Sequence, residues 1–266
     1  MHFVLFNGQI IEKKNLSFYD VERFRVADAC FESMLWIDGR IPLLDGHQKR
    51  LDEVCNYFGF DSHKISLDSI NQLAKIEKIK TNYRRVRVSV IRSQGKNYTP
   101  LGKESKLLVE MEELDDLFLP IQKLGLYREL RKSVSPFSRF KHSNALLYVM
   151  ARQFALKNNF DEVLLFNDNN QIIEASSSNL FFIRDQEIYT PNRNDGGVSG
   201  VCQERLINLL GAKEVKVTEQ MVQDADEIFL SNAVQLIEPV TSFLNRKLDV
   251  VCTKKLIAKL KEDLTL

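Results

Sequence analysis

The sequence lacks the features that would assign it to several large classes of protein. Neither sign of charge is in excess, since 37 lysines and arginines face 36 aspartates and glutamates. No overall field therefore attracts nucleic acid or a membrane surface. No apolar run approaches the ~20 residues that cross a bilayer, and the first eight residues are too short and not basic enough for a signal peptide. Repeats and low-complexity segments are also absent. We therefore expect a globular protein with neither nucleic acid nor membrane as a partner.

Cysteine is scarce, and its spacing excludes two further classes. The four cysteines, Cys30, Cys55, Cys202 and Cys252, are far apart and form no CxxC pair. This usage favours a reduced, cytoplasmic setting over a disulfide framework, and it does not predict a zinc or other metal site.

The first part of the chain alternates between strand and helix patterns. Asn7-Gly8 and Asp38-Gly39 are typical hairpin turns between apolar runs. Apolar residues spaced by three and four predict helices. We expect strands at 3–6, 9–13, 30–37, 40–43, 84–91 and 106–112, and helices at 45–58 and 67–80.

Acidic residues and a proline near 113–120 interrupt these patterns and indicate a domain junction. Beyond it we expect strands at 124–129, 161–166, 188–191 and 226–230, together with one that ends at Glu174. Helices are expected at 145–156, 200–210 and 256–264. The first of these helices places Leu146, Val149, Met150 and Ala155 on one apolar face. The whole predicts two α/β units, residues 1–117 and residues 118–266.

Lys141, in Phe-Lys-His-Ser-Asn (140–144), is the central candidate for chemistry. A lysine amine attacks a carbonyl only when it is unprotonated, which requires desolvation or nearby positive charge. Arg139 and His142 supply such charge, and Phe140 and Leu146 can supply apolar cover. The alternative is a solvated lysine at the start of a helix.

Glu174 is the second candidate, at the end of an alternating strand. Its neighbours Ile172 and Ala175 indicate that it faces inward, where a carboxylate needs a partner. A protonated pyridine nitrogen would be such a partner, and a lysine with this carboxylate is what a protein must supply to use pyridoxal phosphate. The alternative is an exposed strand residue.

Two further features fit an anion site. Gly196 to Gly200 precede a predicted helix, whose first N–H groups can bind a phosphate. Arg50, on the helix 45–58, can supply a two-point contact to the same anion. An ordinary glycine turn and a solvated arginine are the alternatives, and a lone glycine loop is weak evidence.

In their order and spacing, these motifs resemble the fold-type IV pyridoxal-phosphate enzymes, also called class IV aminotransferases. The likeness extends over nearly the whole chain. It lies in the segments 31–33, 38–39, 47–51, 141–144, 161–165, 174–181, 189–191 and 200–201.

The resemblance implies an α/β (α+β) fold of two domains, an N-terminal α/β domain (1–117) and a C-terminal pseudo-barrel α/β domain (118–266) that binds pyridoxal 5'-phosphate. Lys141 would form the Schiff base and move protons at the substrate, and Glu174 would hold the pyridine nitrogen. The resemblance assigns the phosphate to Arg50 and to two backbone turns, Val201-Cys202 and Asn232-Ala233. Cys202 departs from the family, because many of its aminotransferases carry threonine there. The site is expected in a homodimer.

Three positions distinguish members of the family. Branched-chain enzymes usually have tyrosine five residues after the lysine, where this chain has Leu146. The turn at 231–233, Ser-Asn-Ala, is similar to that of aminodeoxychorismate lyases rather than to the Ser/Gly-Thr of many aminotransferases. Lys96 to Pro100 also resemble the Arg-Gly-Tyr-Ser-Pro segment of those lyases, although a lysine cannot make a planar two-point grip.

The resemblance therefore favours a lyase that releases pyruvate from 4-amino-4-deoxychorismate and leaves 4-aminobenzoate for folate synthesis. Lys96, Tyr98, Arg92 and Arg139 are the candidates for binding the substrate, with solvated charge as the alternative for the basic ones. The competing activity is amino transfer from branched-chain or D-amino acids to 2-oxoglutarate, because D-amino-acid enzymes also have leucine after the lysine. A cofactor-free scaffold that kept the fold is the alternative from a different class.

Overall fold

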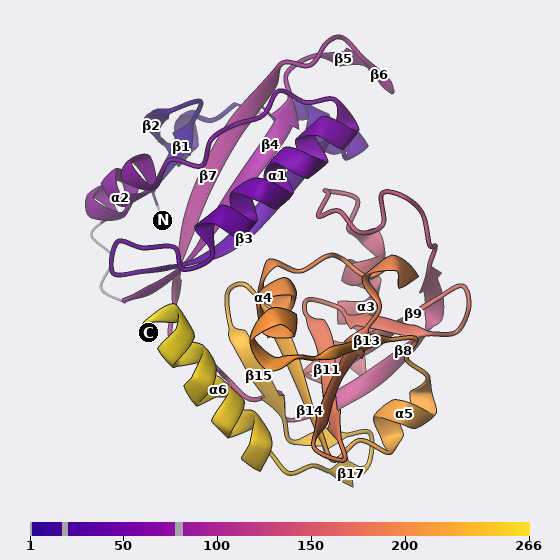
Figure 1. The fold of residues 1–266 in the computed structure, drawn as a ribbon. Coiled ribbons are helices and arrows are strands. Elements are labelled where there is room, and N and C mark those ends of the chain that lie inside the picture. The colour runs from indigo at the N-terminus through magenta and orange to yellow at the C-terminus, as the bar shows by residue number, and fades with distance from the viewer. Residues whose placement is uncertain (1, 18–20, 78–81) are drawn as a thin grey trace. The chain divides into compact units, whose positions relative to one another are not determined.

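The computed structural model describes residues 2–17, 21–77 and 82–266, which form two compact units (Figure 1). The first unit contains Met1–Leu117 together with Phe140–Asn144, and the second contains Phe118–Arg139 with Ala145–Leu266. The sequence placed everything after residue 117 in the second domain. Phe140–Asn144 join the first unit because they pair with its edge strand, as described below.

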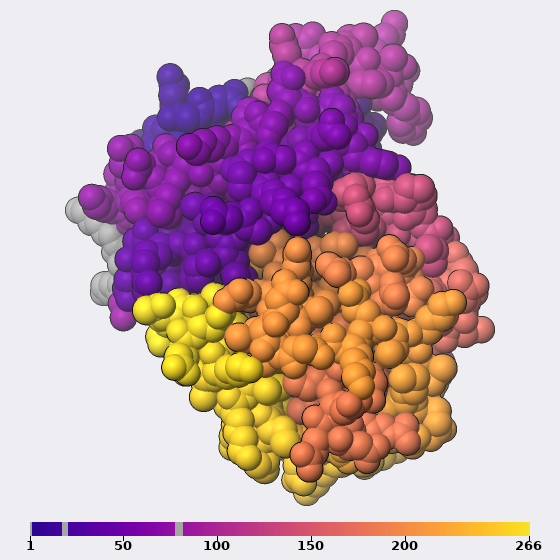
Figure 2. Space-filling view, in the orientation of Figure 1, coloured from indigo at the N-terminus to yellow at the C-terminus, as the bar shows by residue number. Residues whose placement is uncertain are grey.

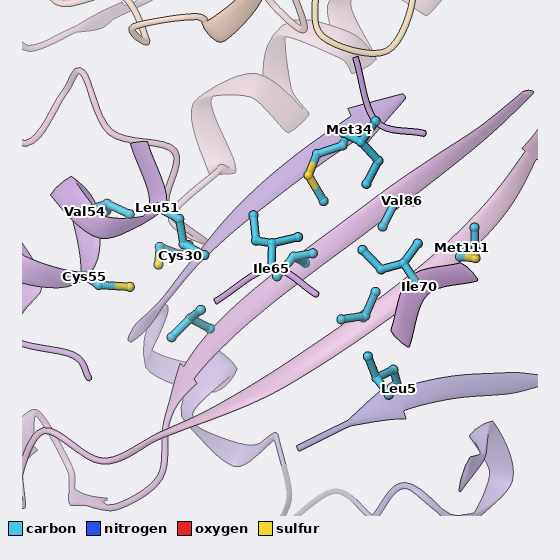
Figure 3. Packing of buried hydrophobic residues seen from close by; sticks show 14 of the residues in the cluster. Leu5, Cys30, Met34, Leu51, Val54, Cys55, Ile65, Ile70, Val86 and Met111 are labelled. Carbon is cyan, nitrogen blue, oxygen red and sulfur yellow. The ribbon is translucent and has the colours of Figure 1, made fainter. Parts of the chain in front are cut away.

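The first unit is built on one antiparallel sheet in the order β2-β1-β7-β4-β3. Side chains from β3, β4, β7, α1 and α2 form its apolar core, and Figure 3 shows Cys30, Leu51, Val54 and Cys55 in this packing. The elements are β1 Phe3–Phe6, β2 Gln9–Glu12, β3 Ala29–Ile37, α1 Leu44–Phe58, α2 Leu67–Ile76, β4 Tyr83–Arg92, β5 Gly95–Lys96, β6 Thr99–Pro100 and β7 Ser105–Leu114, with short 3-10 turns at Lys13–Asn15 and Glu22–Val26.

Helix α1 has both polar and apolar side chains on its buried face. His47, Arg50, Leu51 and Val54 recur at spacings of three and four, so all four lie on one side of the helix. Gly59 ends the helix with φ +67°, a left-handed conformation that glycine adopts without strain. Helix α1 thus directs Arg50 into the unit, so the alternative of a solvated arginine is wrong.

Two local predictions in this unit need correction or comment. No strand forms at 40–43: Asp38 and Gly39 make the turn, a single bridge joins Ile37 to Arg40, and the chain enters α1 at Leu44. The connection is too short for a returning strand. Helix α2 ends at Ile76, and the last three residues of the predicted helix 67–80 lie outside the described part of the chain.

The second unit contains two five-stranded sheets, β10-β9-β8-β16-β17 and β13-β12-β11-β14-β15, with a shared apolar core. Helix α6 lies at the surface of this unit (yellow in Figure 2). The elements are β8 Leu124–Lys132, α3 Leu146–Lys157, β9 Glu162–Asn167, β10 Ile172–Ala175, β11 Asn179–Arg184, β12 Glu187–Pro191, α4 Val201–Leu210, β13 Lys213–Val215, α5 Glu219–Gln223, β14 Glu227–Asn232, β15 Leu236–Val240, β16 Ser242–Phe243, β17 Arg246–Lys247 and α6 Val251–Leu264, with a 3-10 turn at Arg193–Asp195.

Helix α3 packs through a different face from the one that the sequence predicts. Ala151 and Ala155 are fully buried and join the core formed with β8 and β9. Leu146, Val149 and Met150 are exposed instead. Leu147, Tyr148 and Phe154 of the helix also pack against this core, so the packed face is rotated away from Leu146, Val149 and Met150.

Candidate functional site

Lys141 lies in an extended segment that continues the first unit's sheet beyond β3. Phe31 N–H donates to the Lys141 carbonyl at 3.1 Å, and Ser143 N–H donates to the Ala29 carbonyl at 2.9 Å. Cys30 and His142 form an antiparallel bridge. The Lys141 ammonium is 4.8 Å from the centre of the Phe31 ring. The chain therefore holds Lys141 on a sheet edge, partly buried beside an aromatic face, instead of on a solvated helix start.

Arg50 is buried and fixed by Glu32 of β3. Its Nε donates to Glu32 Oε1 at 2.7 Å and its Nη2 donates to Oε2 at 2.5 Å, a two-point grip. His47 Nδ1 is 2.6 Å from the same Oε2. Burial alone would raise the pKa of Glu32, but Arg50 and His47 outweigh it and lower that pKa to about 2. Glu32 is therefore a permanent anion that orients Arg50.

His47 contributes to this cluster as a neutral hydrogen-bond donor. Burial lowers the pKa of His47, and the charges of Arg50 and Lys141 lower it further, against the opposite effect of Glu32. The close contact with Glu32 is thus a hydrogen bond from Nδ1–H and not a charged pair. The combined positive charge near Glu32 comes from Arg50 and Lys141.

A second cationic side chain, Arg87 of β4, lies over the Phe31 ring. The Arg87 guanidinium carbon is 3.8 Å from the centre of the Phe31 ring. Burial lowers the pKa of Arg87, with the nearby Glu110 acting in the opposite direction. Arg87 and Lys141 therefore both present positive charge at one aromatic ring, which suits a planar anionic ligand.

Glu174 lies at the end of β10 and is 3% exposed, as its position in the alternating strand predicts. Its Oε1 accepts from Lys132 Nζ at 2.7 Å and from the Tyr148 hydroxyl at 2.8 Å. Its Oε2 accepts from the backbone N–H of Val198 at 2.8 Å. A carboxylate has about four acceptor positions, so one remains, on Oε2. A protonated pyridine nitrogen needs one such position.

The glycine segment before α4 brings backbone close to Glu174. A Cβ on Gly197 would lie 2.9 Å from the Ile173 carbonyl, and one on Gly200 would collide with the Asn179 amide. Only glycine fits these two positions, so the close approach is built into the sequence. The first N–H groups of α4, at Val201 and Cys202, have no partner within the helix and can donate to an anion.

Cys202 contributes backbone and not a reactive thiol. Its sulfur is buried 3.7 Å from the Leu236 carbonyl, and burial raises the pKa of the thiol to about 12. The thiol therefore does not replace the threonine hydroxyl that many relatives have, in agreement with the expected loss of one contact.

The late turn after β14 is held by its own side chains. Asn232 Nδ2 donates to Ser178 Oγ at 3.0 Å and to Glu238 Oε2 at 2.8 Å. Asn232 Oδ1 accepts from the N–H groups of Val234 and Gln235. Ala233, between them, offers backbone but no hydroxyl. Asn232 therefore shapes the turn, and its phosphate contact stays a prediction.

Arg92 has a structural task and not the predicted contact with the substrate. It is 6% exposed, and it donates to Asp28 and to the carbonyls of Phe58, Gly59 and Gly102. Four bonds to the protein hold it inside the first unit. We therefore drop it from the candidates for substrate binding.

The other predicted substrate residues are exposed. Lys96 and Tyr98 lie on the β5–β6 hairpin, which stands out from the first unit in Figures 1 and 2. Arg23 holds this hairpin by donating to the Asn97 carbonyl at 2.8 Å. Arg139 is also exposed, in the second unit, and its carbonyl accepts from Ser199 N–H. Their contacts with a substrate remain predictions.

Sequence reasoning missed Lys132, Tyr148, Arg87 and the part played by Glu32. Glu32 and His47 lie in motifs that carry the family resemblance, so a search for partners of Arg50 could have found them. Lys132 and Tyr148 are 42 and 26 residues from Glu174, and no local pattern connects them to it.

The model of the family described as amino-transferase class IV matches residues 29–243. The match covers most of the chain, and the chain belongs to this family. It is therefore a pyridoxal-phosphate-dependent enzyme, and two features of the second unit fit that cofactor: the buried acceptor Glu174 and the N-terminal backbone N–H groups of α4.

Individual relatives give a finer comparison. The chain is 23% identical to aminodeoxychorismate lyase of Vibrio harveyi over 231 residues, covering 82% of this chain and 84% of the relative. It is 25% identical to D-alanine aminotransferase of Bacillus licheniformis over 258 residues, covering 90% and 87%.

Solved structures agree on the fold. A Legionella pneumophila protein provisionally assigned as 4-amino-4-deoxychorismate lyase has a TM-score of 0.82 at 26% identity, covering 94% of this chain and 97% of its own. A Brucella abortus aminotransferase bound to PLP has a TM-score of 0.84 at 21% identity, covering 99% of each chain. The predicted α/β fold of fold-type IV enzymes is thereby confirmed.

The described residues contain neither a membrane-spanning helix nor a cluster of metal ligands. In residues 2–17, 21–77 and 82–266, no helix combines the length and apolar character needed to cross a membrane. The same residues contain no group of three or more His, Cys, Asp or Glu arranged to hold a metal ion.

Proposed function

We propose that this enzyme is a 4-amino-4-deoxychorismate lyase, which releases pyruvate and leaves 4-aminobenzoate for folate synthesis. The observation that carries the proposal is the turn at 231–233. Asn232 is committed to Ser178 and Glu238, and Ala233 lacks the hydroxyl that many aminotransferases of the family have there. The likeness to lyases from Vibrio harveyi and Legionella pneumophila supports it.

The chain's own residues have distinct tasks in this reaction. When bound, pyridoxal phosphate supplies an electron sink at the substrate's ring amine. Lys141 Nζ takes and returns the protons that aromatisation requires, and Glu174 keeps the pyridine nitrogen protonated. Arg50 and the backbone at Val201, Cys202, Asn232 and Ala233 bind the phosphate.

Arg87 is our candidate for a substrate carboxylate, in place of Arg92. Its guanidinium and the Lys141 ammonium lie against the same Phe31 ring, at 3.8 Å and 4.8 Å. A ring-bearing dicarboxylate would meet a cation and a flat apolar face beside the reactive amine. Lys96, Tyr98 and Arg139 stay candidates for the second carboxylate.

The competing activity is amino transfer. The D-alanine aminotransferase of Bacillus licheniformis is about as similar as the lyases, and Leu146 agrees with either activity. The Lys141, Glu174 and phosphate positions would serve both reactions. The choice between them depends on the turn and on substrate contacts, so an assay must decide it.

A paired assay tests the proposal. The purified protein is given 4-amino-4-deoxychorismate and, separately, D-alanine or branched-chain amino acids with 2-oxoglutarate. We expect 4-aminobenzoate and pyruvate in equal amounts, and no product from Lys141→Ala. Rapid amino transfer without 4-aminobenzoate would reverse the assignment.

A separate experiment tests whether the protein binds pyridoxal phosphate through Lys141. The wild-type protein should be yellow, with a visible band that borohydride bleaches and that Lys141→Ala lacks. A colourless protein that ignores added pyridoxal phosphate would contradict both activities.

We also propose that the enzyme is a cytoplasmic homodimer. The second unit has six large apolar side chains that are exposed, and burial of such side chains would stabilise an interface with a second copy. They are Leu130, Val134, Phe137, Leu146, Val149 and Met150. Sedimentation of the wild type against Val149→Glu measures this, and a wild type that sediments as a monomer at micromolar concentration would contradict it.

A further inference from the structure

Lys132 and Tyr148 form a closed polar group with the carboxylate of Glu174. Lys132 Nζ donates to Glu174 Oε1 and to the Tyr148 hydroxyl, each at 2.7 Å, and that hydroxyl donates to Oε1 at 2.8 Å. All three groups are largely buried, with the Lys132 and Glu174 side chains 11% and 4% exposed. Each of these polar atoms meets a partner inside the group, as buried polar networks require.

The charges in this group balance before any ligand arrives. An isolated buried carboxylate is costly and tends to take up a proton. Lys132 supplies the countercharge for the buried Glu174 carboxylate in the cofactor-free protein. Burial and the neighbouring Glu174 raise the pKa of Tyr148 well above its usual value, so its hydroxyl stays a donor.

The group also fixes which acceptor position of Glu174 is open. Lys132 and Tyr148 occupy Oε1, and Val198 N–H occupies one position of Oε2 at 2.8 Å. The carboxylate cannot turn without breaking bonds at both oxygens. One directional acceptor position, on Oε2, is left for an N–H donor.

We propose that Lys132 and Tyr148 are positioning residues that preset Glu174 as a charged acceptor for the cofactor's ring nitrogen. They act through Glu174. The proposal depends on cofactor binding and not on the lyase reaction, so the two can fail separately.

The test compares two ligands that differ at one atom. One is pyridoxal 5'-phosphate, and the other is its carbocyclic analogue, in which a C–H group replaces the ring nitrogen. The dissociation constants of both are measured by fluorescence quenching on the cofactor-free protein. Their ratio reports the contact between Glu174 and the ring nitrogen. A general loss of folding or of phosphate binding would weaken both ligands and leave the ratio unchanged.

We expect the wild type to prefer pyridoxal phosphate by about 10- to 100-fold, the range of a hydrogen bond to a charged group. Lys132→Met should reduce this preference about tenfold, and Lys132→Arg should restore most of it by returning the charge. Tyr148→Phe removes one neutral hydrogen bond and should reduce the preference about threefold. Lys213→Met is the matched control, because it removes a lysine from an exposed ion pair with Glu187, and it should change nothing.

Two outcomes would overturn the proposal. The first is a folded Lys132→Met variant that prefers pyridoxal phosphate over the carbocyclic analogue as strongly as the wild type does. The second is an equal loss in Lys132→Met and Lys132→Arg, which would show that charge is not what Lys132 supplies. If Lys132→Met does not fold, Tyr148→Phe decides, and an unchanged preference there rejects the inference.

Discussion

Glu238 provides a pH-dependent test of the second unit, because its carboxyl is buried and its hydrogen-bond donors, Ser178 and Asn232, are neutral. It is 9% exposed, and it accepts from Ser178 Oγ at 3.0 Å and from Asn232 Nδ2 at 2.8 Å. Burial is the main cause that raises the pKa of Glu238, and the charge of Glu162 acts in the same direction. With the opposing effects of Ser178 and Arg152 included, the pKa is about 7. Folding therefore favours the protonated acid.

The size and sign of the effect follow from linkage. A pKa that moves from 4.5 in the unfolded chain to about 7 in the folded one corresponds to about 3 kcal/mol. Because the folded pKa is the higher one, the folded state binds more protons between these values. The contribution of Glu238 to the free energy of unfolding should therefore be highest below pH 4.5 and fall by about that amount as the pH rises to 8.

Glu238→Gln removes this titration while keeping the size of the side chain. Urea unfolding at several pH values between 4.5 and 8 gives the free energy of unfolding for wild type and variant. The variant should gain about 3 kcal/mol relative to wild type across this range. The other carboxylates titrate equally in both proteins and cancel in the difference.

Glu214→Gln is a control of opposite sign. The Arg193 side chain lowers the pKa of Glu214, so its contribution to stability is present above pH 4.5 and is lost as the pH falls below that value. The control is therefore also measured below pH 4.5. A difference between Glu238→Gln and wild type that is flat, or that slopes like the control, would refute the reasoning.

Three further predictions concern the cofactor and the substrate. Glu32→Gln removes the anion that compensates Arg50, so it should destabilise the first unit by about 3–5 kcal/mol in urea unfolding and weaken the binding of pyridoxal phosphate. Unchanged values of both quantities would contradict the role of Glu32 in holding Arg50. Gly200→Ala should also weaken that binding, measured by the visible band, because the new Cβ collides with Asn179 and displaces the start of α4. Arg87→Gln should raise the KM for the lyase substrate about tenfold or more with little change in Tm. Arg92→Gln should lower Tm instead, because it removes hydrogen bonds inside the first unit. A raised KM in Arg92→Gln and a lowered Tm in Arg87→Gln would restore Arg92 as the candidate for binding the substrate.

The sequence predicts most elements because local patterns decide them. The alternation around Glu174 correctly indicates a buried side chain, and the spacing in residues 45–58 correctly predicts a helix that buries Leu51 and Val54. The face of α3 was predicted wrongly, because periodicity marks an apolar stripe but not what lies opposite it. On α3 the two alanines pack together with Leu147 and Phe154, whereas Leu146, Val149 and Met150 are exposed.

Partners far apart in sequence account for the other failures. Arg92 could be taken for a substrate residue because Asp28, 64 residues away, gives no local sign of binding it. Lys132 likewise gives no sign that it will meet Glu174. Charge in a sequence is visible, but its neutralisation by a distant side chain becomes visible only in the fold.

Both predicted charges of the cofactor site are compensated by the protein itself. Arg50 is held by Glu32 within the first unit, and Glu174 is held by Lys132 within the second. An unpaired buried charge would shift its protonation or move when no ligand is present. Because each charged side chain already has a partner, neither has to change its protonation or its orientation when the cofactor binds. The entropic cost of ordering these side chains is then part of folding and not of cofactor binding. The lysine and the glutamate that stand out in the sequence thus depend on two residues, Glu32 and Lys132, whose importance only their contacts reveal.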